Sequence, residues 1–109
     1  MPKYLLHGRY NAAMVEALHT NGATSRLDAI AAGTAGVGGS VDCCYWTNSG
    51  TENWVIADLP DDAAANAIVL SVSRHSTDGA WATVTRLLDA TDLDTAIARN
   101  SSMRPPGTD

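Results

Sequence analysis

Two runs of β-favouring residues, at 40–48 and 51–59, are separated only by the turn sequence Asn48-Ser49-Gly50. A connection this short joins antiparallel neighbours, because parallel strands need a crossover of a dozen or more residues. The two runs therefore predict a β-hairpin in the middle of the chain. The other elements have to be arranged around this hairpin.

The hairpin is flanked on each side by a strand and a helical segment. Residues 3–10 alternate in the way a strand does, and residues 11–35 have helical spacing with an interruption at Asn21-Gly22. Residues 61–74 predict a further helix, and residues 81–88 predict the fourth strand. The expected order of elements is thus β-α-β-β-α-β.

This order predicts an α+β fold of the ferredoxin-like type, with a four-stranded antiparallel sheet and both helices on one face. The strands at 3–10 and 51–59 are then the central ones. A chain of 109 residues fits one domain, which we expect over residues 1–99 with a short last helix at 93–98. The Pro- and Gly-containing tail at 100–109 is expected to be disordered.

The second face of such a sheet has no helix to cover it. Whichever set of alternate strand residues points to that face, it includes large apolar side chains. The candidates are Leu5, Trp54 and Ile56 on one side, and Tyr4, Leu6, Val55 and Leu59 on the other. A bare apolar face of this size is typical of an association site. We therefore expect a homodimer in which two sheets face each other.

Charge and composition exclude several classes of partner. Twelve acidic against seven basic residues give a net charge of -5, which repels nucleic acid. No run approaches the roughly 18 apolar residues of a membrane span, and the first residues do not resemble a signal peptide, so a cytoplasmic location is expected. Cys43 and Cys44 are adjacent and cannot join distant segments. Glu16 and His19 have no further ligand at matching spacing, so we expect no metal and no cofactor.

Four stretches of the chain, taken together, resemble the GYD-domain family of small bacterial proteins. They are MPKYLLHGRY, GGSVDCCYW, the segment from Gly50 through VIADLPDDAAANAIVL, and TVTRLL. The resemblance covers residues 1–98 and implies the dimeric α/β-barrel superfamily. The Gly-x-Tyr-Asp motif is degenerate, because this chain has Gly50-Thr51-Glu52-Asn53 in its place.

His7 and Arg9 are the candidate catalytic residues. They lie two apart on a central strand and share a face with Leu5, near Trp54 and Ile56 if parity is kept across neighbours. His7 is suited to act as a general base, with Arg9 as the partner of an oxyanion. The alternative is that His7 is a hydrogen-bonded interface residue and Arg9 a charge at its rim.

Aromatic residues on the strands are the candidate walls of a ligand pocket, because the chain contains no Phe. The predicted ligand-binding residues are Trp46, Trp54, Ile56, Tyr45 and Trp81. We therefore expect a dimer that holds an apolar or aromatic small molecule, with cofactor-free oxidation, isomerisation or cyclisation as its reaction if it is an enzyme. The alternative is a non-catalytic ligand-sensing or protein-interaction module.

Overall fold

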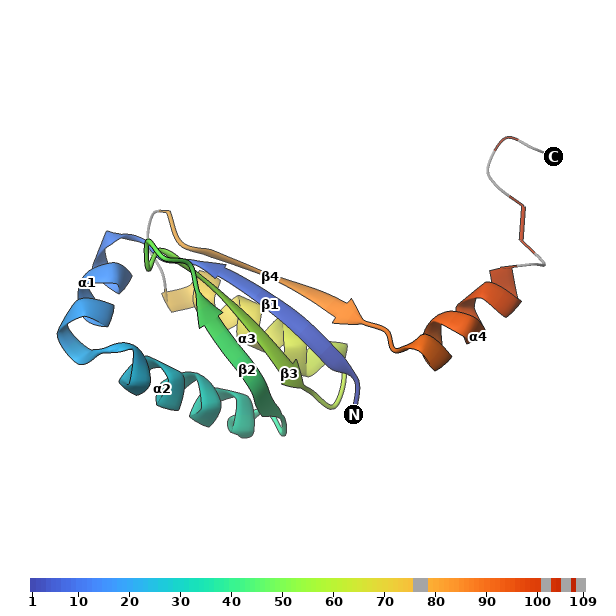
Figure 1. Cartoon of the computed structure of the whole chain (residues 1–109), viewed down its shortest axis with the longest axis horizontal. Coiled ribbons are helices and arrows are strands. Elements are labelled where there is room, and N and C mark those ends of the chain that lie inside the picture. The colour runs from blue at the N-terminus through green and yellow to red at the C-terminus, as the bar shows by residue number, and fades with distance from the viewer. Residues whose placement is uncertain (76–78, 101–102, 105–106, 108–109) are drawn as a thin grey trace.

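The computed structural model describes residues 1–75, 79–100, 103–104 and 107. In these ranges the chain forms an α+β fold with one four-stranded antiparallel sheet and four helices (Figure 1). The elements are β1 (Lys3–Arg9), α1 (Ala12–Asn21), α2 (Ala23–Gly36), β2 (Ser40–Trp46), β3 (Glu52–Asp58), α3 (Asp62–His75), β4 (Trp81–Leu87) and α4 (Ala90–Asn100). The order of elements predicted from the sequence is confirmed, and the predicted interruption of the first helical region is the boundary between α1 and α2.

Local residue chemistry explains where these elements begin and end. The side chain of Asn11 accepts a hydrogen bond from the backbone N–H of Met14 at 2.9 Å, and the side chain of Asp61 accepts one from Ala64 at the same distance. Gly22 ends α1 at a φ of +85°, a conformation that is strained for residues with a β-carbon. Gly50 adopts a φ of +73° in the turn between β2 and β3.

The strands lie in the order β2-β3-β1-β4, so β1 and β3 are central as expected. Leu6 is paired with Val55, and His7 is paired with Trp54 across the β1–β3 ladder. The β2–β3 ladder shifts register between Val41 and Cys43, where β2 contains one extra residue. This β-bulge changes which side chains of β2 face each side of the sheet.

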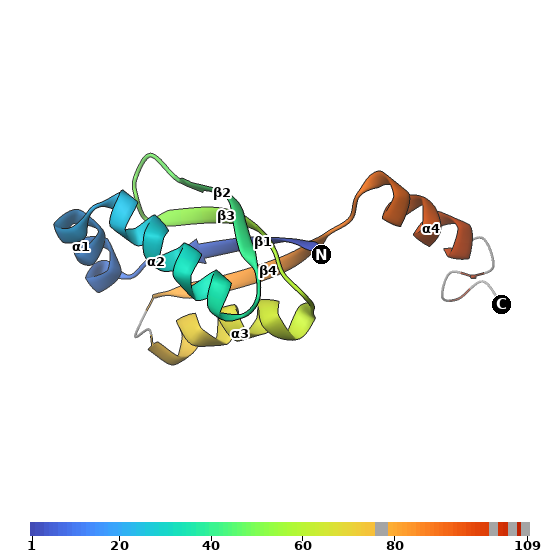
Figure 2. The same cartoon turned by 90° about the horizontal axis from the view of Figure 1, so that it is seen from below.

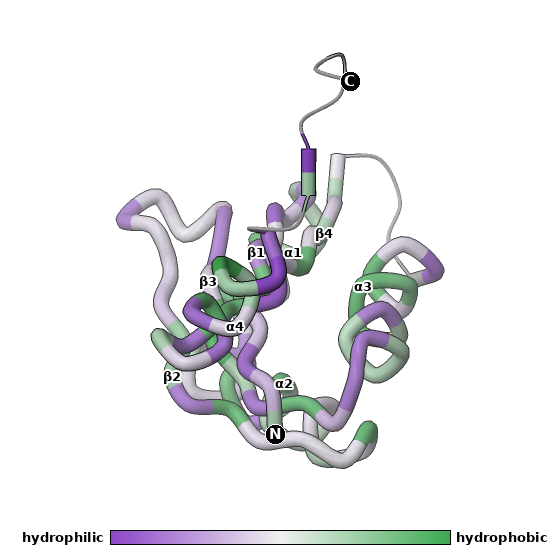
Figure 3. Tube along the Cα trace, turned by 90° about the vertical axis from the view of Figure 1, so that its right-hand side faces the viewer, coloured by the Kyte–Doolittle hydropathy of each residue, from purple (hydrophilic) through white to green (hydrophobic). Residues whose placement is uncertain are grey.

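One face of the sheet carries the core and is covered by α2 and α3 (Figures 1 and 2). The buried cluster consists of Tyr4, Leu6, Val55, Ala57, Leu59 and Ala65, with Ile30, Val37 and Ile68 packed against it. Figure 3 shows hydrophobic and hydrophilic residues mixed along α3, as expected for a helix with one face on a sheet. The structure thus decides between the two parities: Tyr4 and Leu6 face the helices, and Leu5 faces away.

The last helix differs from the sequence-based expectation. It begins at Ala90, because the side chain of Asp89 accepts the N–H of Asp92 at 2.7 Å, and it continues to Asn100. It extends away from the sheet (Figures 1 and 2), which explains a radius of gyration of 17.0 Å against about 13 Å for a compact domain of this length. Leu93 and Ile97 on α4 are exposed. Six of the ten residues of the predicted disordered tail, at 101–102, 105–106 and 108–109, lie outside the described residues.

Candidate functional site

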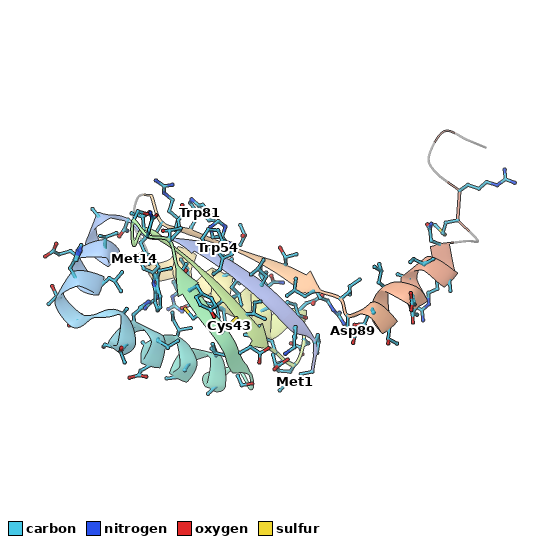
Figure 4. The ribbon with its side chains drawn as sticks, in the orientation of Figure 1. Met1, Met14, Cys43, Trp54, Trp81 and Asp89 are labelled. Atoms are coloured by element: carbon cyan, nitrogen blue, oxygen red, sulfur yellow. The ribbon has the colours of Figure 1, made fainter. Side chains whose placement is uncertain are left out.

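The face of the sheet that no helix covers, here called the open face, carries a cluster of aromatic rings around His7. The ring of His7 stacks on Trp54 with centroids 4.1 Å apart and an interplanar angle of 10°. Trp81 meets the same ring edge-on at 4.8 Å and 88°. Figure 4 shows Trp54 and Trp81 close together at one end of the sheet. Strand alternation explains the grouping, because His7 lies opposite Trp54 on β3 and next to the start of β4.

His7 also has an acidic partner. Its Nε2 donates a hydrogen bond to Oε1 of Glu52 at 2.9 Å, and both side chains are one-quarter exposed. A carboxylate that holds one ring nitrogen fixes the tautomer and leaves Nδ1 available to accept a proton. This is the arrangement of an oriented general base, and it is equally the arrangement of a hydrogen-bonded structural histidine.

Sequence patterns did not identify Glu52 as a site residue, because it stands out only as a replacement within the degenerate motif. The signal that could have revealed it is its register. Glu52 lies opposite Arg9, and Arg9 is two residues from His7 on the same face of the sheet. Glu52 is therefore a diagonal neighbour of His7, and long side chains can reach across such a diagonal.

Most of the predicted site residues lie on the open face. Ile56 and Tyr45 join Trp54 there, since Ile56 pairs with Leu5 and Tyr45 pairs with Trp54. Arg9 is exposed at the end of β1, opposite Trp81. The exposed side chains of Trp54, Trp81 and Tyr45 give this face an apolar patch.

Trp46 does not belong to this group, and the prediction that Trp46 and Trp54 form walls of one pocket is wrong. Trp46 pairs with Asn53 and faces the helices, where its Nε1 donates a hydrogen bond to the hydroxyl of Tyr10 at 3.2 Å. The β-bulge in β2 is the reason, because one extra residue exchanges the faces of all side chains that follow it.

A separate cavity lies on the helix side of the sheet, at the end where β1 terminates. Its volume is about 80 Å³. Its apolar lining includes Leu6, Met14, Ile30, Val55, Ile68 and Val72. His7, Arg9 and Trp81 also border this cavity, although the ring of His7 stacks on Trp54 on the open face.

The lining of this cavity includes a buried polar group. Asn53 is 7% exposed, and its side chain hydrogen-bonds with Cys44. Burial raises the pKa of the Cys44 thiol, and this hydrogen bond offsets the effect only in part. Gly8 lies opposite Asn53, and a β-carbon there would come within 2.8 Å of the Asn53 Oδ1 atom. Gly8 thus leaves room for the Asn53 side chain.

Metal-binding residues are not gathered at either place. No group of three or more His, Cys, Asp or Glu side chains that could hold a metal ion occurs within residues 1–75, 79–100, 103–104 and 107. No helix in the described part of the chain has the length and apolar character needed to cross a bilayer.

Comparison of the chain with known proteins gave a negative result. No family model, no curated protein and no solved structure matches it.

Proposed function

We propose that this protein is a homodimer that binds a small apolar or aromatic molecule between its sheet and its helices. The observation that carries the proposal is the cavity lined by Leu6, Ile30, Val55 and Val72, which combines apolar walls with a few polar groups. Concave, mostly apolar sites with few polar groups are the usual form of small-molecule sites.

The open face supports the dimeric part of the proposal. Trp54 and Trp81 are each more than one-third exposed, and Tyr45 is 70% exposed. Leu5 and Ile56 pair in the next row of the sheet, beside Trp54, and are only half-buried. A second copy of the same face would remove these side chains from water, as in a self-complementary twofold interface. Membership of the GYD-domain family and of the dimeric α/β-barrel superfamily belongs to the same proposal, supported by the strand order β2-β3-β1-β4.

The hydrogen-bonded pair His7 and Glu52 favours a second candidate, in which the ligand lies at the dimer seam and His7 removes a proton from it without a cofactor. Arg9, on the same strand face, would then stabilise the oxyanion. The two candidates differ in which side of the sheet the ligand occupies. Because the His7 ring is on the open face, only the second one requires His7 for binding.

A ligand-binding experiment separates the two candidates. Native mass spectrometry of the purified protein is expected to show a dimer that carries additional mass. Ala82 lines the cavity, so A82L is expected to fill it and abolish the additional mass. Ala67 is exposed on α3, so A67L is the control and should retain the ligand.

The same measurement on a histidine pair completes the design. H7A is expected to leave the helix-side ligand bound, with H19A, an exposed histidine on α1, as the matched control. Loss of the ligand in H7A alone would move the site to the dimer seam. A purified protein that is monomeric and binds nothing would contradict both candidates.

A further inference from the structure

The helix-side cavity lies next to a second hollow between α1 and α2. The first has a volume of about 80 Å³ and the second about 200 Å³. The two share three lining residues, Tyr10, Met14 and Arg26. Arg26 therefore lies where the two hollows adjoin.

Arg26 is held at this junction by an aromatic ring. Its guanidinium carbon lies 5.8 Å from the centroid of the Tyr10 ring, within the range of a cation–π contact. Tyr10 is itself fixed, because it is buried and its hydroxyl accepts the hydrogen bond from Trp46. The Tyr10 ring thus offers the guanidinium a fixed aromatic surface at this junction.

Among the described residues, the guanidinium of Arg26 has no acidic partner. Arg26 is half-buried, and no carboxylate is within ion-pairing distance of it in the part of the chain that the structure describes. Arginine donates five N–H groups in a planar fork that matches a carboxylate. A half-buried guanidinium that lines an apolar cavity and has no carboxylate partner among the described residues favours an anion over a neutral group.

The surroundings of Arg26 define the shape of the ligand. Leu6, Ile30 and Ile68 line the first cavity only and give it apolar walls, whereas Arg26 lines both hollows. We propose that the site takes a small monocarboxylate with an aromatic or aliphatic body, whose carboxylate binds Arg26 and whose body enters the cavity. This rests on the proposed function and adds the charge of the ligand to it. Both hollows are smaller than the roughly 300–1,000 Å³ of drug-sized sites, so the body is limited to about one ring.

The test compares phenylacetate with 2-phenylacetamide, which has the same shape without the charge, by titration at pH 7 followed by amide NMR shifts. Because a hydrogen bond to a charged group contributes more than a neutral one, wild-type protein is expected to bind phenylacetate about tenfold or more tightly. R26M is expected to reduce this preference to near one, and R26K to retain part of it. R74M removes an exposed arginine on α3 that lines neither hollow, and should keep the full preference.

Each other result overturns the inference. Equal affinity for the two probes in wild-type protein, or a preference that survives in R26M, excludes Arg26 as the carboxylate site while leaving the proposed apolar cavity in place. Binding of neither probe contradicts the inference and the proposed function together. If R26M does not fold, the wild-type ratio and R26K still decide the outcome, since R26K keeps the cation beside Tyr10.

Discussion

Replacing Trp54 by alanine is expected to weaken dimerisation through the open face by a calculable amount. Trp54 is 37% exposed, and a tryptophan side chain presents up to about 250 Å², so about 90 Å² remains available for a partner. At about 25 cal/mol per Å², this corresponds to about 2 kcal/mol from each protomer. A twofold interface contains the residue twice, so W54A should cost about 4–5 kcal/mol and raise the dimer Kd about a thousandfold.

Sedimentation equilibrium over a wide concentration range measures this change directly. L70A is the matched control, since Leu70 is an exposed apolar residue on α3 and lies away from the open face. Because Trp54 also stacks on His7, W54A should in addition lower the free energy of unfolding by about 1 kcal/mol. Urea unfolding at a concentration where the protein is monomeric separates this local effect from the loss of the dimer.

The reasoning would be refuted by wild-type protein that stays monomeric at tens of micromolar. It would be refuted equally by W54A dimers as stable as the wild type, because a dimer that does not need Trp54 uses a different surface. A similar weakening of the dimer in L70A would show that the effect of W54A is not specific to the open face.

Three further outcomes follow from burial. L59A should lower the free energy of unfolding by about 2–5 kcal/mol in chemical denaturation, because the Leu59 side chain is fully buried. A smaller loss would mean that neighbouring side chains fill the space that the substitution leaves. Truncation after Asp89 should change the free energy of unfolding of the monomer by less than about 0.5 kcal/mol, because α4 buries no side chain; a large loss would show that α4 packs on the sheet. In a C43S background, iodoacetamide at pH 8 should modify Cys44 more slowly in the folded protein than in urea, since burial raises the pKa of this thiol and reduces the thiolate fraction. Equal rates would place Cys44 in solvent.

The sheet and its connections were predictable because their signals are local. The turn at Asn48-Ser49-Gly50 and the break at Gly22 depend on residues that favour these backbone conformations. The last helix was less predictable, since Asp89, Thr91 and Asp92 are all suitable caps and only the observed hydrogen bond from Asp92 to Asp89 selects the start.

The apolar pattern of the strands leaves the choice of the buried face open, although the charges contain the information. Lys3 and Arg9 alternate on β1 with Tyr4 and Leu6, and charged side chains avoid a core unless they are paired. The structure follows this rule: Lys3 lies on the open face and forms ion pairs with Asp42 and Asp58. Counting the charges on each parity therefore identifies the open face from the sequence alone.

The β-bulge in β2 could not be predicted in this way, and it decides which aromatic residues belong to the candidate site. Before the bulge, Val41 pairs with Ala57, and an unbroken register would then pair Tyr45 with Asn53. The observed partner of Tyr45 is Trp54, one residue further along β3. An unbroken register would have put Trp46 opposite Glu52 on the open face and turned Tyr45 toward the helices. Asp42, the extra residue, forms its ion pair with Lys3 on β1, which is 39 positions away in the chain. Single-strand patterns contain no signal for such a contact, so a period-two reading assigns every residue after the bulge to the wrong face.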